Sequence, residues 1–100
     1  MEVKINSVHF NADQKLVEFV NKKVNKLDTF FDGILKVEVI LKVAKPEAAK
    51  NKVSELKLSI PSQDYLFAKK QADTFEEATD LAIDAIKKQL VKYKEKLKSK

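Results

Sequence analysis

One stretch of the chain, residues 35–43, constrains the fold more than any other. Its odd-numbered positions are all Leu or Val, and three of the four positions between them are charged, Ile40 being the exception. Side chains two apart lie on the same face of a β-strand, so this alternation predicts a strand with one apolar and one largely polar face. Such a strand needs partner strands and a second layer that covers its apolar face.

Weaker alternation predicts three more strands, at residues 3–7, 55–60 and 65–72. The last two are separated by Pro61-Ser62-Gln63-Asp64, which are turn-forming residues, and should form an antiparallel hairpin. Residues 45–51, around Pro46, are expected to form a surface loop.

Apolar residues spaced three and four apart predict a first amphipathic helix between the first two strands. Asn11 or Asp13 can cap its N-terminus. Its apolar stripe continues to Phe31, and Gly33, the only glycine, follows where a left-handed C-cap is expected.

A second apolar stripe predicts a helix from Thr74 to about residue 98. Thr74 is a favourable N-cap, and Glu77 follows at the capping-box spacing. At 1.5 Å per residue this helix would be about 37 Å long, whereas a nine-residue strand spans about 30 Å. Its last turns should therefore project beyond the sheet.

These elements predict an α+β fold with the order β-α-β-β-β-α. Two long helices would pack on one face of a four-stranded sheet, and a chain of this length has room for one core, so we expect a single domain over residues 1–100. The other face of the sheet should be solvated and mixed in charge, carrying Lys4, Lys36, Glu38, Lys42, Glu55 and Lys57.

The net charge of +5 is concentrated at one end of the chain. Residues 82–100 contain seven lysines and two acids, whereas residues 1–81 contain thirteen of each. A basic end on a neutral body suggests an anionic polymer as partner, and lysine without arginine favours phosphate contacts over the reading of base edges. The alternative is a solvated helix end matched to the helix dipole.

The sequence offers little for catalysis. The chain has no cysteine, one glycine and one histidine, His9, so it supplies no thiolate, no Gly-rich phosphate loop and no histidine metal cluster. We expect His9 to be a surface or packing residue, and we predict no enzymatic activity, cofactor, metal or small-molecule substrate. The N-terminus lacks a signal-peptide pattern and no apolar run could span a membrane, which predicts a cytoplasmic protein.

Helical geometry indicates where the lysines lie. On the first helix, Lys22 and Lys26 should face away from the core, while Lys23 borders the apolar stripe. On the second helix, one flank should carry Lys87, Lys94 and Lys98. The far side should carry Lys88 and Lys92, and Lys96 should lie opposite the apolar stripe. Apart from Tyr93, aromatic residues do not interleave with these lysines, which argues against single-strand base stacking.

Three segments resemble a known family: Leu27-Asp28-Thr29-Phe30-Phe31-Asp32-Gly33, Val39-Ile40-Leu41-Lys42-Val43-Ala44-Lys45, and the basic helix from Ile83 to Lys98. With the order β-α-β-β-β-α, they resemble the short ribosome hibernation promoting factors and protein Y-like ribosome-associated translation inhibitors over essentially the whole chain. The chain departs from the family pattern in two places. Thr74-Phe75-Glu76 stands where many members have Asp-Met-Tyr, and Ala72 replaces a glycine.

The resemblance implies a topology like that of double-stranded-RNA-binding domains and a role in ribosome hibernation. Members occupy the mRNA and tRNA channel of the small ribosomal subunit and block translation under stress or in stationary phase. Short members favour inactive ribosome dimers, usually with a separate modulation factor, and lack the C-terminal dimerisation domain of long members. Eight lysines match basic positions of the family, namely Lys23, Lys26, Lys42, Lys45, Lys88, Lys92, Lys94 and Lys96.

Lys22 and Lys87 are basic here without a clear counterpart, and we include them among the expected RNA-binding residues. Two other functions remain open. One is a protein-interaction module whose C-terminal helix docks an acidic partner protein, which nuclease treatment of the target would distinguish from RNA binding. The other is a small enzyme of ferredoxin-like shape, for which the sequence supplies no catalytic group.

Overall fold

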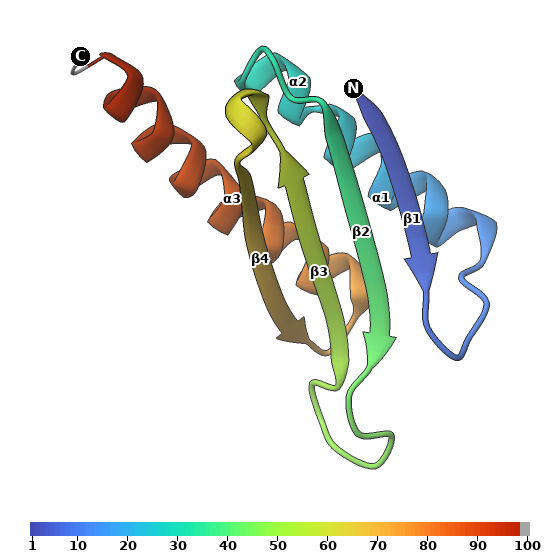
Figure 1. The fold of residues 1–100 in the computed structure, drawn as a ribbon. Helices are drawn as coiled ribbons and strands as arrows, with labels where there is room; N and C mark the ends of the chain where they lie inside the picture. Colours follow the sequence, from blue (N-terminus) through green and yellow to red (C-terminus); the bar gives the residue numbers. More distant parts are fainter. Residues whose placement is uncertain (99–100) are drawn as a thin grey trace.

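The computed structural model describes residues 1–98, which form one four-stranded sheet with all the α-helices on one side (Figure 1). The predicted α+β fold and its order β-α-β-β-β-α are confirmed, except that the first helix is divided in two. In chain order the elements are β1 (Glu2–Ser7), α1 (Gln14–Asn25), α2 (Leu27–Phe30), β2 (Lys36–Val43), β3 (Lys52–Ser59), the 3-10 helix η1 (Pro61–Gln63), β4 (Tyr65–Ala72) and α3 (Phe75–Lys98).

The strands lie side by side in chain order, β1-β2-β3-β4. β1 runs parallel to β2, and the other two pairs are antiparallel, so the predicted hairpin of β3 and β4 is confirmed. A parallel pair needs a crossover connection, and α1 and α2 supply it. The register places Val37 of β2 opposite both Val3 and Leu58, so the apolar positions of neighbouring strands meet on the covered face.

The first helix begins at the predicted cap and ends differently from the prediction. Asp13 accepts a hydrogen bond from the amide of Leu16 at 2.8 Å. A turn at Lys26 separates α1 from α2, and Thr29 donates both its amide and its hydroxyl to the Lys26 carbonyl. Such local bonding of a threonine competes with the regular helical pattern. Phe31, in extended conformation, ends α2, and Gly33 lies in the turn beyond it with φ 106° instead of capping the helix.

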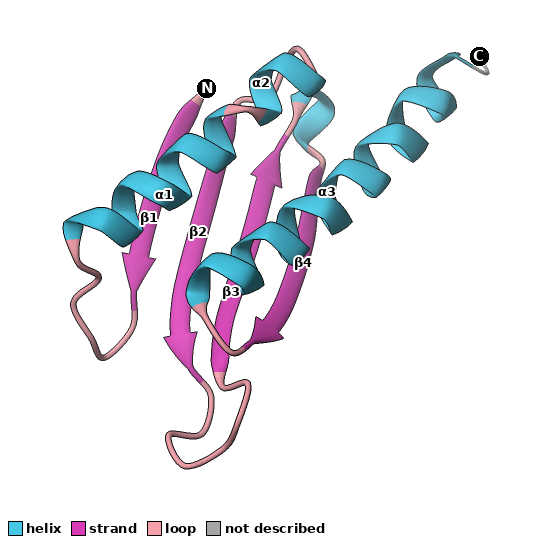
Figure 2. Cartoon of the chain, turned by 180° about the vertical axis from the view of Figure 1, so that it is seen from behind, coloured by secondary structure: helices cyan, strands magenta, loops and turns pink. Residues whose placement is uncertain are grey.

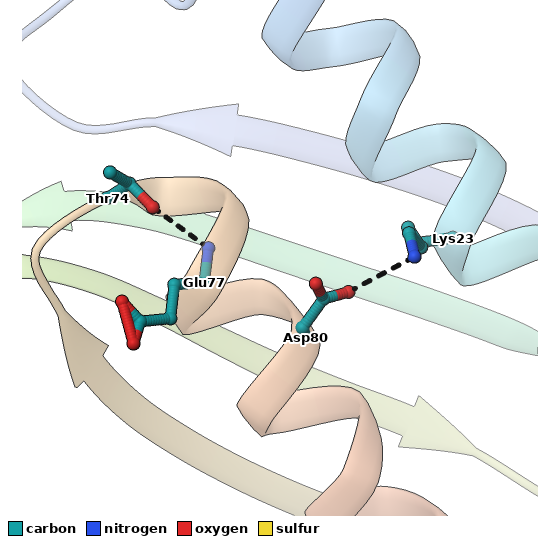
Figure 3. Close-up of polar contacts among 4 residues, drawn as sticks. All are labelled: Lys23, Thr74, Glu77 and Asp80. Atoms are coloured by element: carbon teal, nitrogen blue, oxygen red, sulfur yellow. Dashed lines mark hydrogen bonds and ion pairs between the residues drawn. The ribbon is translucent and has the colours of Figure 1, made fainter.

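The predicted capping box at the N-terminus of α3 consists of two hydrogen bonds, and one of them is formed. The hydroxyl of Thr74 accepts a hydrogen bond from the amide of Glu77 at 3.1 Å (Figure 3). In the described part of the chain the Glu77 carboxylate makes no return bond, so the capping box is half formed. Glu76 and Glu77 place negative charge at the positive end of the helix dipole.

The core lies between the helices and the sheet (Figure 2). Its only buried side-chain hydrogen bond among the described residues joins the hydroxyls of Thr79 on α3 and Ser54 on β3 at 3.1 Å. At one end, Phe10 stacks on Phe75 with ring centroids 4.9 Å apart. Eleven aliphatic side chains of the core are almost completely buried: Val20, Val24, Leu27, Val37, Val39, Leu41, Leu56, Leu58, Ile60, Ile86 and Leu90.

The C-terminal turns of α3 project beyond the sheet, as predicted (Figures 1 and 2). The helix has 24 residues and is therefore about 36 Å long, whereas the eight-residue strands span about 26 Å. Leu97, on the apolar stripe of this projecting part, is 51% exposed. The last turns of α3 therefore extend past the end of the sheet.

Candidate RNA-binding surfaces

The lysines at the C-terminal end of α1 and in the turn that follows it lie on the predicted sides of the helix. Lys22 and Lys26 are exposed, while Lys23 is half-buried, with its ammonium 5.5 Å from the ring centroid of Phe19. Lys23 also pairs with Asp80 of α3 at 3.6 Å, so this contact links the two helices (Figure 3). A phosphate at this point would compete with Asp80 for the same ammonium.

Two lysines of α3 surround the aromatic end of α2. The Lys94 ammonium donates a hydrogen bond to the carbonyl oxygen of Phe30 at 2.8 Å and lies 4.8 Å from that ring's centroid. Lys87 lies 5.7 Å from the same ring. Phe30 is the last residue of α2, where unpaired carbonyls carry partial negative charge. Lys94 therefore holds α2 against α3, a structural role that the sequence did not predict.

Lys88 and Lys92 are exposed on the outer side of α3, and within residues 1–98 neither has an ion pair. Lys96 lies elsewhere from its predicted position: it lines a hollow with Ser62, Asp64, Tyr93 and Leu97. It therefore points toward the turn between β3 and β4 instead of away from the apolar stripe. The predicted position of the Lys98 side chain lies outside the described residues.

Charge changes along α3. The first three turns carry the acids Glu76, Glu77, Asp80 and Asp84, and the following turns carry the lysines. The lysines of α3 and those near the end of α1 form what we call the helix-side surface. It is defined by Lys22, Lys23, Lys26, Lys87, Lys88, Lys92 and Lys94. Its lysine-rich end lies beside α2 and the projecting part of α3, away from the acidic first turns, so an anionic polymer would be attracted to that end.

Lys42 and Lys45 do not belong to this surface. Lys42 lies on the open face of the sheet, opposite the helices, and pairs with Glu55 at 2.7 Å. Lys45 is exposed in the loop after β2, where its carbonyl accepts a hydrogen bond from buried Asn51 at 2.9 Å. The structure thus brings together seven of the ten predicted lysines and leaves Lys42, Lys45 and Lys96 on other parts of the molecule.

The open face of the sheet has the mixed charge that the sequence predicts. Glu38 lies opposite both Lys4 and Lys57, and Glu55 lies opposite Lys69. Sequence reasoning missed the aromatic residues of β4, Tyr65 and Phe67, which are 61% and 47% exposed. The two-residue spacing of Tyr65, Phe67 and Lys69 along this strand could have indicated that all three share one face.

Outside the lysine groups, the remaining residue of interest is the single histidine. His9 is exposed, with φ 64°, as expected for a surface residue. Among the described residues, no group of three His, Asp or Glu side chains is arranged to hold a metal ion. None of the helices in the described chain combines the length and apolar character that crossing a membrane requires.

A four-stranded sheet covered on one face by helices is a fold shared with solved structures, one of which is a ribosomal subunit interface protein. The structure superimposes on such a protein from Coxiella burnetii with a TM-score of 0.83 at 21% sequence identity, covering 94% of this chain and 98% of the other. The N-terminal domain of Thermus thermophilus Protein Y gives a TM-score of 0.77 at 21% identity, covering 93% and 99%.

The family model described as "Sigma 54 modulation protein / S30EA ribosomal protein" matches residues 3–98, and the chain belongs to this family. It is 34% identical over 99 residues to a ribosome hibernation promoting factor of Pseudomonas putida, covering 99% of this chain and 92% of the relative. To the ribosome hibernation promoting factor of Escherichia coli K12 it is 33% identical over 98 residues, covering 98% of each. The predicted family is confirmed, and it agrees with the prediction of a binding protein without enzymatic activity.

Proposed function

We propose that this chain is a ribosome hibernation factor that binds the small ribosomal subunit in the mRNA and tRNA channel and inhibits translation under stress or in stationary phase. Family membership and the names of its relatives support the hibernation role. The observation that carries the RNA-binding part is the helix-side surface, whose lysines Lys22, Lys26, Lys88 and Lys92 are exposed.

The mechanism is occlusion. Lysine ammonium groups bind phosphates as point charges, and the folded domain then excludes mRNA and tRNA from the space it fills. No bond is made or broken, so the inhibition is reversible. Each phosphate contact releases condensed counterions, and binding should therefore weaken steeply as salt is raised.

The location of the protein, its binding unit and a second partner follow from this proposal. Ribosome binding would place the protein in the cytoplasm, and the proposed binding unit is the single domain over residues 1–100. Pairing of ribosomes into inactive dimers would involve a separate modulation factor.

Co-sedimentation with intact ribosomes tests the proposal. The variant Lys22→Glu/Lys26→Glu/Lys88→Glu changes three exposed lysines of the helix-side surface and should lose most of its ribosome binding, because each reversal replaces attraction to phosphate by repulsion. Lys15→Glu/Lys50→Glu/Lys70→Glu is the matched control, since it alters the net charge equally at exposed positions outside this surface. Its binding should remain the closer of the two to wild type.

Equal binding by both triple variants would show that net charge, and not this surface, determines affinity. Displacement by mRNA or tRNA should accompany saturable binding, and absence of the wild-type protein from ribosomal fractions even at low salt would refute the proposal.

A second candidate is a module that docks an acidic partner protein through α3. The exposed apolar residues Val91 and Leu97, which are 43% and 51% exposed beside the lysines, favour it. Nuclease treatment of the target would abolish RNA binding but leave this protein contact intact.

A further inference from the structure

The open face of the sheet presents two aromatic rings to solvent. Tyr65 and Phe67 are 61% and 47% exposed, and they share this face because they lie two residues apart on β4 while the helices cover the opposite face. Two residues along a strand span about 6.8 Å. That spacing is about twice the 3.4 Å rise between stacked bases, so neighbouring rings can each receive one unstacked base.

One ammonium group lies over the Tyr65 ring, and a second lysine follows Phe67 on the same face. Lys57 of β3 stands directly opposite Phe67 in the register, and its ammonium lies 4.4 Å from the centroid of the Tyr65 ring. Lys69 follows Phe67 on the same face of β4, opposite Glu55, whose carboxylate is already paired with Lys42 at 2.7 Å. On this face β4 carries aromatic, aromatic, basic and amide side chains in succession, and no acid.

A side chain of α3 holds β4 in position. Gln89 of α3 donates a hydrogen bond to the Phe67 carbonyl at 2.8 Å. This contact occupies an acceptor at the outer edge of the sheet, where an added strand would have to pair. The arrangement therefore favours a ligand on the face of the sheet over a second copy of the chain added at its edge.

We propose that this face binds single-stranded RNA, with unpaired bases stacked on Tyr65 and Phe67 and phosphates contacted by Lys57 and Lys69. Exposed aromatic rings beside cations are the elements with which single-strand-binding proteins hold bases without reading their sequence. This site is distinct from the helix-side surface, because the sheet and the core lie between them, and it goes beyond the proposed contact with the ribosome.

Intrinsic fluorescence tests the proposal on the intact chain. The protein has two tyrosines and no tryptophan, so in a Tyr93→Phe variant all tyrosine emission comes from Tyr65. Tyr93 is half-buried with its ring edge-on to Phe31, and phenylalanine preserves that packing. Titration with an oligouridylate of about twelve nucleotides should quench this emission saturably, whereas a blunt RNA duplex of equal length should not.

Affinity measurements supply the second readout. Tyr65→Ser/Phe67→Ser should weaken binding of fluorescein-labelled oligouridylate at least about tenfold. Leu35→Ser/Leu81→Ser, the matched control, removes exposed apolar side chains elsewhere and should bind as wild type. Because the substituted side chains are exposed, circular dichroism should show all variants folded.

The outcomes separate the two proposals. Unchanged emission together with unchanged oligouridylate affinity of the serine variant would overturn the single-strand site. Self-association of the wild type that the serine variant abolishes would assign the face to a second copy instead. Loss of oligouridylate binding with retained co-sedimentation would support this site as one separate from the ribosome-binding surface, and the helix-side variant should show the opposite pattern.

Discussion

At the scale of single residues, similar lysines have different environments. Lys94 and Lys88 belong to the same helix, yet Lys94 is hydrogen-bonded to the end of α2 and Lys88 is exposed. Helical spacing predicted the sides of α3 on which Lys88 and Lys94 lie, although it misplaced Lys96. It did not predict the contacts of Lys94, because they depend on how α2 packs against α3. A binding test that replaces Lys94 would therefore disturb the fold as well as the surface.

Replacing Lys94 by methionine should lower the free energy of unfolding by about 1 kcal/mol. Methionine keeps the packing of the side-chain stem over Phe30 but loses the charged hydrogen bond to the last carbonyl of α2. Urea denaturation measures the change, with Lys88→Met as the control, for which we expect a change within about 0.5 kcal/mol. Equal stabilities of the two variants would remove the structural role assigned to Lys94.

At the scale of elements, the chain marks helix beginnings more clearly than helix ends. Asp13 and Thr74 cap α1 and α3 through local hydrogen bonds that a sequence pattern can indicate. The turn at Lys26 depends on the hydrogen bond from the Thr29 hydroxyl to the Lys26 carbonyl. The spacing of apolar residues does not indicate which carbonyl accepts this bond. The apolar stripe continues unbroken through the turn, which is why the pattern predicted a single helix.

The cap of α3 offers a test at this scale. Thr74→Ala removes the side-chain acceptor for the Glu77 amide and should cost about 1 kcal/mol of stability, whereas Thr74→Ser keeps the hydroxyl and should stay near wild type. Thermal unfolding of both variants provides the comparison. If serine were as destabilising as alanine, the loss would have to come from the threonine methyl group and not from the cap.

At the scale of the whole molecule, the sequence predicted the layers but not the composition of each surface. Alternation in residues 35–43 placed Lys42 on the open face, and the structure agrees. The RNA-binding role that the family resemblance implies for Lys42 stays a prediction. The exposed rings of Tyr65 and Phe67 meet Lys57 only through the register of β3 and β4. Residues that do not interleave along the chain thus interleave across strands, which removes the sequence argument against base stacking.

The position of β1 has a consequence for how the native state opens. It pairs with one strand only, in parallel, and it is joined to that strand through the long crossover of α1 and α2, whereas β3 is paired on both sides by chain neighbours. Detaching β1 would leave β2, β3, β4 and α3 as a contiguous unit, so we expect a partial opening that costs less free energy than global unfolding. Native-state hydrogen exchange should show the bonded amides of β1 less protected than those of β3, and equal protection in both strands would mean that the domain opens only as a whole.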